Sequence, residues 1–186
     1  MQFVEFELYI NPSWINMRII VASILVLCLQ TAIKAQNPSE ISSAEITFNF
    51  VEKDVDGSIG GFSSNSSIHW NALENSTISG SVETETIKTG NFIRDWSLRG
   101  SKYFDADQYP HITFKSEKIA LGGTDVLVDG LLTIKGISKP VQIRFKREGN
   151  QLIGTTTLFS SDFNITILKK GRDANKVIVQ FNLQLK

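Results

Sequence analysis

The chain has 186 residues, of which 41% are hydrophobic, 10% aromatic and 20% charged. These fractions are typical of a globular protein and exclude a disordered or collagen-like chain. Lys and Arg together number 19, as do Asp and Glu, so the net charge is zero. A neutral chain has no overall field that attracts nucleic acid, and we expect no nucleic-acid partner.

An apolar run near the N-terminus, Ile19–Leu29, follows the single cation Arg18 and precedes the small residue Ala35. This order predicts a secretory signal peptide over 17–35, with cleavage after Ala35. A run of this length would rise only ~16 Å as a helix, against ~30 Å for a bilayer core, so we expect no permanent membrane span. The expected location is therefore outside the cytoplasm, in a periplasm or in the medium.

Residues 1–16 contain Glu5 and Glu7 and no Lys or Arg. A signal peptide normally begins with a cationic segment. We therefore expect that translation starts at Met17, and that 1–16 reflect a mis-annotated start codon.

The one cysteine, Cys28, lies within the apolar run, so the mature domain over 36–186 would contain none. Disulfide bonds and thiol catalysis are then excluded. Lipid attachment at Cys28 is the alternative to simple cleavage, although the bulky Leu27 stands where lipoprotein processing favours a small residue.

Alternation with period two dominates 36–186. In its last segment every second residue from Val177 to Leu185 is apolar, and Gln180, Asn182 and Gln184 stand between them. This period places one set of residues on each face of a strand. The pattern predicts strands near 44–51, 59–70, 76–88, 111–119, 125–135, 140–147, 151–160, 163–169 and 176–185.

Short strands at even spacing favour a β-sandwich or a barrel. Gly80, Gly130 and Gly154 fall within the predicted strands. Glycines there mark bends or bulges, but they could also leave room for a channel. Both explanations stay open.

One segment, 91–100, departs from the alternation. Asn91 is a candidate N-cap, Gly100 a candidate stop, and the apolar residues between them have helical spacing. We predict one short helix here.

Two long blocks resemble the YceI-like family. The first extends from Arg94 to Ser116 and includes the sequences RDWSLR, YFD and YPHITFKS, and the second is VDGLLTIKGISKPV over 128–141. Weaker matches at 82–89 and 61–62 occur in the same order. Together they cover about 44–186.

The resemblance implies an all-β, antiparallel, lipocalin-like closed barrel of about eight strands with one short helix. It also implies an elongated apolar channel that binds a polyisoprenoid, an isoprenoid quinone or a related lipid. Ser160 and Asn164 stand where the family commonly has an arginine and a glycine. This departure weakens the expectation of a diphosphate-bearing ligand.

The strand phase and the resemblance together select the candidate channel lining. It comprises Phe48, Phe50, Val82, Phe114, Val128, Leu132, Ile134, Val141, Ile143, Phe145, Val179, Phe181 and Leu183. Arg94 and Arg99 on the predicted helix are candidates for contact with the ligand's polar end, because a guanidinium can hydrogen-bond a quinone carbonyl or a phosphate. An ion-paired helix that merely closes one end of the barrel is the alternative.

The residues give little indication of catalysis. His69 and His111 have no metal-ligand partner at short spacing, and no nucleophile-elbow motif is present. We expect no metal, no cofactor and no enzymatic activity. The main alternatives to a lipid carrier are a stress-related structural or partner-binding barrel with a side-chain-filled core, and a lipid hydrolase or isomerase; homodimerisation is left open.

Overall fold

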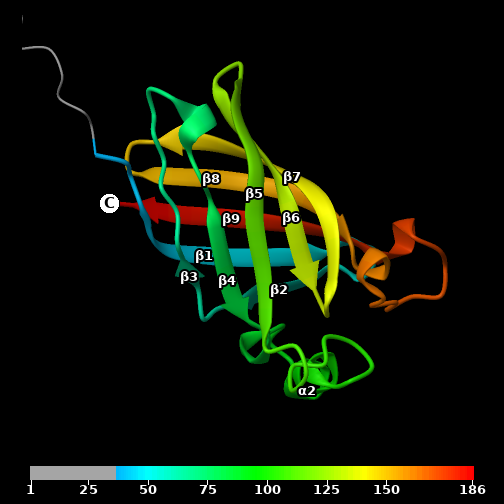
Figure 1. The fold of residues 1–186 in the computed structure, drawn as a ribbon. Helices are drawn as coiled ribbons and strands as arrows, with labels where there is room; N and C mark the ends of the chain where they lie inside the picture. The colour runs from blue at the N-terminus through cyan, green and yellow to red at the C-terminus, as the bar shows by residue number, and fades with distance from the viewer. Residues whose placement is uncertain (1–36) are drawn as a thin grey trace, which may run out of the picture. The chain divides into compact units, whose positions relative to one another are not determined.

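Nine β-strands form one antiparallel sheet in residues 37–186, the part of the chain that the computed structural model describes (Figure 1). The predicted signal peptide and start segment lie outside it. The strands are β1 (Ile41–Phe50), β2 (Val55–Ile59), β3 (Ser63–Ser64), β4 (Ser79–Glu83), β5 (His111–Gly122), β6 (Asp125–Ile134), β7 (Ile137–Glu148), β8 (Gln151–Phe159) and β9 (Lys176–Leu185).

The sheet order is β2-β1-β9-β8-β7-β6-β5-β4-β3, so β2 and β3 are its edges. The long strands β5 to β8 are joined in sequence by tight turns, and each pairs with the next. The last strand, β9, lies between β8 and the first strand, β1. The alternating sequence of β9 therefore belongs to a central strand that has neighbours on both sides.

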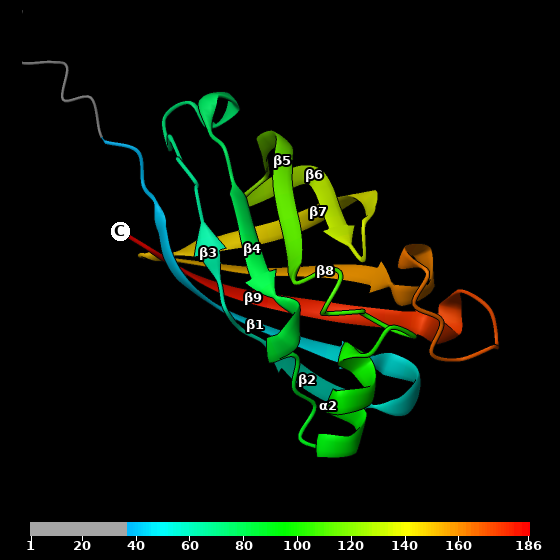
Figure 2. The same ribbon diagram turned by 60° about the horizontal axis from the view of Figure 1, so that its bottom comes forward.

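The curved sheet forms a half-barrel whose edges approach each other (Figure 2). Ser58 in β2 and Lys88, beyond β4, exchange two backbone hydrogen bonds of 2.9 and 3.0 Å. The N–H of Glu83 donates to the carbonyl of Gly60 at 3.0 Å. The sequence predicted a closed barrel of about eight strands. The structure instead has nine antiparallel strands, and no continuous row of backbone hydrogen bonds joins the two edges of the sheet.

The edge is irregular because serine side chains in 63–67 satisfy local backbone groups. Ser64 and Ser66 each donate a side-chain hydrogen bond to the carbonyl of Ser79 at 3.1 Å, and their hydroxyl oxygens lie 2.7 Å apart. Such bonds compete with ladder pairing. The strand predicted over 59–70 is therefore reduced to the two residues of β3.

The strand predicted over 163–169 is also wrong. A 3-10 helix, η4 (Ser160–Phe163), ends at Asn164 in the left-handed conformation, with φ at 59°. Beyond it the fully buried side chain of Asn175 accepts hydrogen bonds from two backbone N–H groups and donates to two carbonyls. The side chain of Asn175 thus makes the hydrogen bonds to the loop's backbone that a neighbouring strand would otherwise make.

The predicted helix is present as α2 (Phe92–Arg99), and the Asn91 side chain caps it by accepting from the N–H of Arg94 at 3.0 Å. Within 37–186 no helix is long and apolar enough to cross a membrane.

Each glycine noted within the strands lies beneath a phenylalanine ring. An added Cβ at Gly154 would lie 2.3 Å from the ring of Phe145, and one at Gly130 would lie 2.7 Å from that of Phe114. At Gly80 the nearest ring is that of Phe62, at 3.2 Å. The missing side chains thus make room for aromatic rings and, at Gly130 and Gly80, for the backbone carbonyls of Lys115 and Ser63, a close approach of the kind that glycine in a strand permits.

Candidate functional site

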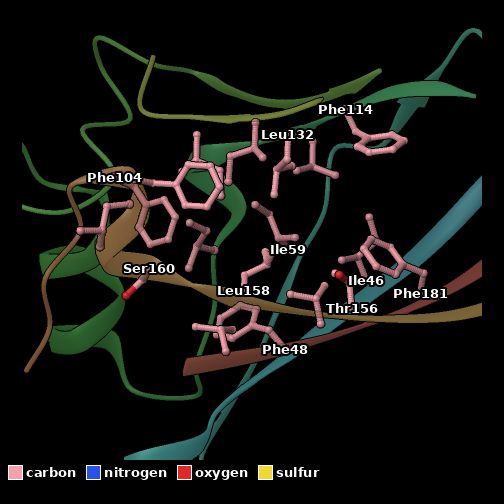
Figure 3. A pocket seen from close by; sticks show the side chains of 18 of the residues that line it. Ile46, Phe48, Ile59, Phe104, Phe114, Leu132, Thr156, Leu158, Ser160 and Phe181 are labelled. Carbon is pink, nitrogen blue, oxygen red and sulfur yellow. The ribbon is translucent and has the colours of Figure 1, made fainter. Parts of the chain in front are cut away.

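A cavity of about 900 Å³ occupies the interior of the half-barrel on the side of α2 (Figure 3). This volume lies within the range of ~300–1,000 Å³ that ligand pockets occupy. At ~30 Å³ for a group the size of a water molecule, the space holds a chain of roughly thirty heavy atoms. Its walls come from all nine strands, with α2 and η4 near one end.

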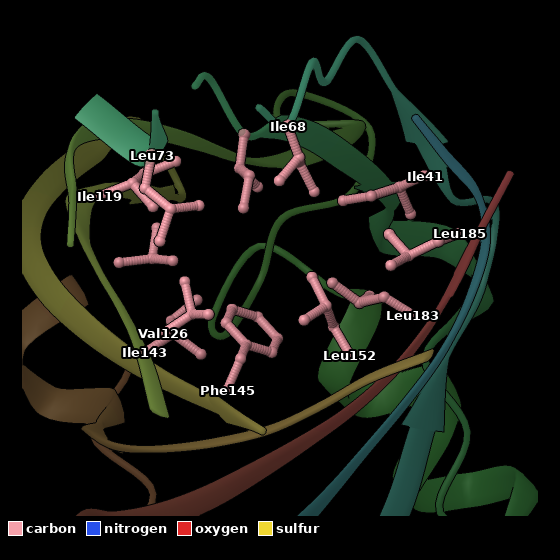
Figure 4. Close-up of a cluster of buried hydrophobic side chains, with 12 residues drawn as sticks. Ile41, Ile68, Leu73, Ile119, Val126, Ile143, Phe145, Leu152, Leu183 and Leu185 are labelled. Atoms are coloured by element: carbon pink, nitrogen blue, oxygen red, sulfur yellow. The ribbon is translucent and has the colours of Figure 1, made fainter. Parts of the chain in front are cut away.

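The opposite end of the barrel is filled by its own side chains (Figure 4). Ile68 and Leu73, from the segment between β3 and β4, pack there against strand residues such as Ile119 and Leu152. The interior is therefore hollow at one end and solid at the other. Five residues of the packed cluster also border the cavity: Ile41, Ile78, Ile143, Phe145 and Leu183.

The cavity is lined by all of the residues predicted to form the channel wall except Val128. Val128 is fully buried in the filled end, opposite Ile119 of β5 and Ile143 of β7. Its strand phase was correctly inferred as inward. Its position along the barrel axis places it in the packed core instead of the cavity, and its assignment to the lining is corrected.

Several lining residues were missed by the sequence analysis. Ile46, Ile59 and Leu158 continue the inward phase of β1, β2 and β8, so the alternation contained a usable signal for them. Phe104 and Phe163 lie outside the strands, Phe104 in a loop without periodic pattern and Phe163 in η4, where the alternation had predicted a strand. Only the tertiary structure brings these last two rings to the cavity.

Most groups that face the cavity are apolar, and a set of polar ones gathers at the α2 end. This set comprises Lys53, Thr89, Asn91, Arg94, Ser97 and Ser160. Ser64, Ser79, Ser81, Thr113 and Thr156 add hydroxyl groups along the strands. The charged groups lie at the α2 end, where a polar group of a ligand would be stabilised.

Arg94 is held in place by Thr89, which lies two residues before the cap Asn91. Its Nε donates to the hydroxyl of Thr89 at 2.6 Å, and its Nη2 donates to the Thr89 carbonyl at 2.8 Å. No hydrogen bond of its Nη1 is found within 37–186. The guanidinium is thus oriented and retains a donor for a ligand.

The structure places Arg99 differently. It does not line the cavity; its Nη1 lies 3.1 Å from a carboxylate oxygen of Glu85, and its Nη2 donates to the Ile87 carbonyl at 3.2 Å. It links α2 to the segment after β4. Of the two arginines predicted to contact the ligand's polar end, only Arg94 lines the cavity. Arg99 instead forms the kind of ion pair expected if the helix merely closes one end of the barrel.

Asp95 ties the helix to the same residue, Thr89. Its carboxylate accepts hydrogen bonds from both the hydroxyl and the backbone N–H of Thr89. These bonds, with smaller contributions from the two nearby arginines, lower the pKa of Asp95 below its ordinary value although burial opposes them. The charged form therefore supports the position of α2 at neutral pH.

Ser160 occupies the position where the resemblance leads one to expect an arginine. Its Oγ is buried and has no hydrogen-bond partner within the described part of the chain, and the residue lines the cavity near α2. Figure 3 shows the hydroxyl at the helix end of the cavity. A buried polar atom without a partner is costly, so this hydroxyl is well placed to bond to a polar ligand atom.

The histidines lie apart from the cavity. His111 is exposed at the start of β5, and His69 is near Ser67, with a 3.3 Å contact between Nε2 and the hydroxyl. Neither lines the cavity, and 37–186 contain no cluster of three His, Cys, Asp or Glu residues suited to a metal.

Comparisons with known proteins agree with this architecture. BcnA of Burkholderia cenocepacia is similar in fold, with a TM-score of 0.67 at 22% identity over 77% of this chain and 96% of that chain. A domain of Saccharophagus degradans described as polyisoprenoid-binding and implicated in plant cell wall breakdown has a TM-score of 0.56 at 14% identity, over 81% and 99%.

Curated relatives match over a shorter stretch. A UPF0312 protein of Pectobacterium atrosepticum is 32% identical over 97 residues, which are 46% of this chain and 50% of that protein. The chain thus spans about half the length of the curated relatives it matches. The family model described as the YceI-like domain matches residues 36–185, nearly the whole of the described unit. The chain belongs to the YceI-like family.

Proposed function

We propose that this protein is an exported carrier that holds one long apolar ligand in its cavity and does not transform it. The observation that carries the proposal is the cavity of about 900 Å³, closed by packed hydrocarbon at one end and bounded by polar groups at the other. A polyisoprenoid or an isoprenoid quinone has the matching division into a long apolar chain and one polar end. The described binding of the Saccharophagus degradans domain, which shares the fold, supports this ligand class.

The energetics favour a chain-like ligand. Burial of hydrocarbon contributes ~0.8 kcal/mol per CH₂ group, so a ligand that fills the cavity needs few polar contacts to bind tightly. The polar contacts then determine orientation, with the head beside α2. Arg94 and Ser160 both offer hydrogen bonds there, and a neutral carbonyl can accept from both.

The ligand's head is better matched to a quinone than to a diphosphate. Two of the polar residues near α2 carry a positive charge, Lys53 and Arg94. Two nitrogens of the Arg94 guanidinium already donate hydrogen bonds to Thr89. Ser160 supplies a neutral hydroxyl where other family members commonly have a cation. A doubly charged head would therefore be incompletely compensated.

Binding without turnover is part of the proposal. Neither histidine faces the ligand space. The export signal at 17–35 would deliver the domain to the periplasm or the medium, where an apolar ligand needs shielding from water.

A matched pair of variants tests whether the ligand occupies the cavity. Thr156 points into it from β8, and its neighbour Thr157 is exposed on the outer face. Thr156→Phe fills part of the space, whereas Thr157→Phe adds the same ring outside. Titration of delipidated protein with a long-chain quinone and with a polyprenyl phosphate should show at least tenfold weaker binding for Thr156→Phe only.

The control for folding is the thermal unfolding of both variants, since Thr156 also donates to the carbonyl of Gln142 at 2.8 Å. Failure of wild type to bind either lipid would refute the carrier function. Equal affinities of the two folded variants would place the ligand elsewhere.

A further inference from the structure

The outer face of α2 exposes three large apolar side chains together. Phe92 is 82% exposed, Ile93 75% and Trp96 72%. Residues three and four positions apart lie on one side of a helix, so the three form a single apolar patch. Among the described residues this is the largest local concentration of exposed aromatic and aliphatic side chains.

The patch is continuous with the ligand cavity. Ile93 belongs to both, since it lines the cavity and is also mostly exposed. Asn91, Arg94 and Ser97 of the same segment bound the cavity from the inside. The helix therefore separates the hollow end of the barrel from its surroundings.

The charges around the patch are mixed in sign, as in the neutral chain as a whole. The segment 88–102 carries four cations, Lys88, Arg94, Arg99 and Lys102, against the buried Asp95. Further acids lie beside them: Glu85 pairs with Arg99, and Asp105 and Asp107 stand in the loop whose backbone bonds to the end of α2. The patch is therefore distinguished by its apolar side chains and not by its charge.

We infer that α2 is a membrane-docking element that seats the hollow end of the barrel on a bilayer surface. A patch of phenylalanine, isoleucine and tryptophan matches the bilayer interface, where tryptophan is enriched and the apolar face of a helix is buried. The inference builds on the proposed carrier function: docking at this end lets an apolar chain pass between bilayer and cavity without crossing water.

A second copy of the chain is a poorer occupant of the patch. Three side chains bury too little for a stable dimer. Even full burial covers about 600 Å² per partner, below the ~800 Å² of a standard interface.

The test uses the protein as the cell processes it and sediments it with vesicles of phosphatidylethanolamine containing phosphatidylglycerol. The double variant Phe92→Gln, Trp96→Gln removes the patch and leaves the cavity lining intact, since neither residue contributes to it. Leu121→Gln is the matched control, because Leu121 is 67% exposed at the far end of β5.

Wild type and Leu121→Gln should partition onto the vesicles alike, and the double variant at least about tenfold less. On a Trp70→Phe background, vesicles should shift the emission of Trp96 to the blue. Quinone titration in solution should be unchanged in the double variant.

Equal sedimentation of the double variant and wild type would overturn the docking inference. So would a patch-dependent dimer in analytical ultracentrifugation without vesicles, which would assign the face to a second copy. If the protein binds ligand but not vesicles, docking is refuted and the carrier function stands. If it binds vesicles through the patch but binds no ligand, the carrier function is refuted and docking stands.

Discussion

Replacement of Phe181 by Asp examines the strand phase on which the cavity wall depends. Phe181 lines the cavity from β9, and its ring centroid lies 5.9 Å from that of Phe145. Gln180, the preceding residue, is exposed on the other face of the same strand. Gln180→Asp is therefore a control with the same new side chain one position away.

The expected cost follows from what the wall loses. Truncation of a fully buried Phe costs ~3–5 kcal/mol, and the partly buried Phe181 loses less than this. A carboxylate facing apolar side chains adds to the cost. The hollow space offsets part of it, because water can enter and solvate the new group. We expect Phe181→Asp to lose at least ~3 kcal/mol of a total near 5–15 kcal/mol, and Gln180→Asp to change by less than ~0.5 kcal/mol.

Urea and thermal unfolding followed by circular dichroism measure both variants. At ~2–4 °C per kcal/mol for a domain of this size, Tm should fall by at least about 6 °C in Phe181→Asp alone. The loss should shrink at acidic pH, because a carboxyl in apolar surroundings has a raised pKa and is buried at lower cost once protonated. Equal losses in the two variants, or a loss independent of pH, would refute the assigned phase.

The remaining predictions concern the helix end of the cavity. Arg94→Ala should weaken binding of a long-chain quinone by ~1 kcal/mol, about fivefold, whereas Arg99→Ala should leave the affinity unchanged. Calorimetric titration measures both affinities. Weaker binding in Arg99→Ala alone would mean that Arg99, and not Arg94, contacts the ligand. The lowered pKa of Asp95 means that its stabilisation is complete above its ordinary value of ~3.9 and is lost as pH falls through the lower folded value. The stability gap between wild type and Asp95→Asn, measured by urea unfolding, should therefore narrow from pH 6 to pH 3, and a constant gap would mean that the bonds from Thr89 do not depend on the charge.

Much of the cavity wall was predictable because strands impose a strict period of two. Once the alternation of β1, β7 and β9 is read, residues such as Phe48, Ile143 and Val179 can face only one side. The short helix was equally visible, since Asn91 and Gly100 mark its ends by local chemistry. These features depend on neighbours in sequence, and a sequence contains them directly.

Position along the barrel was not predictable. Val128 and Ile134 share the inward face of β6, yet Val128 belongs to the filled end and Ile134 lines the cavity. The segment between β3 and β4 determines which end is filled, by bringing Ile68 and Leu73 over one opening. That contact joins segments far apart in the chain, and no local pattern encodes it.

The family, the β-rich architecture and the inward set of side chains were thus determined by the sequence itself, through periodicity and local motifs. The tertiary structure alone decided that the barrel is hollow only at the α2 end, that Arg99 pairs with Glu85 while Arg94 borders the cavity, and that Phe92 and Trp96 face outward. The physical reason is that a side chain's period gives its face on one element, whereas its environment depends on which distant segment packs against that face.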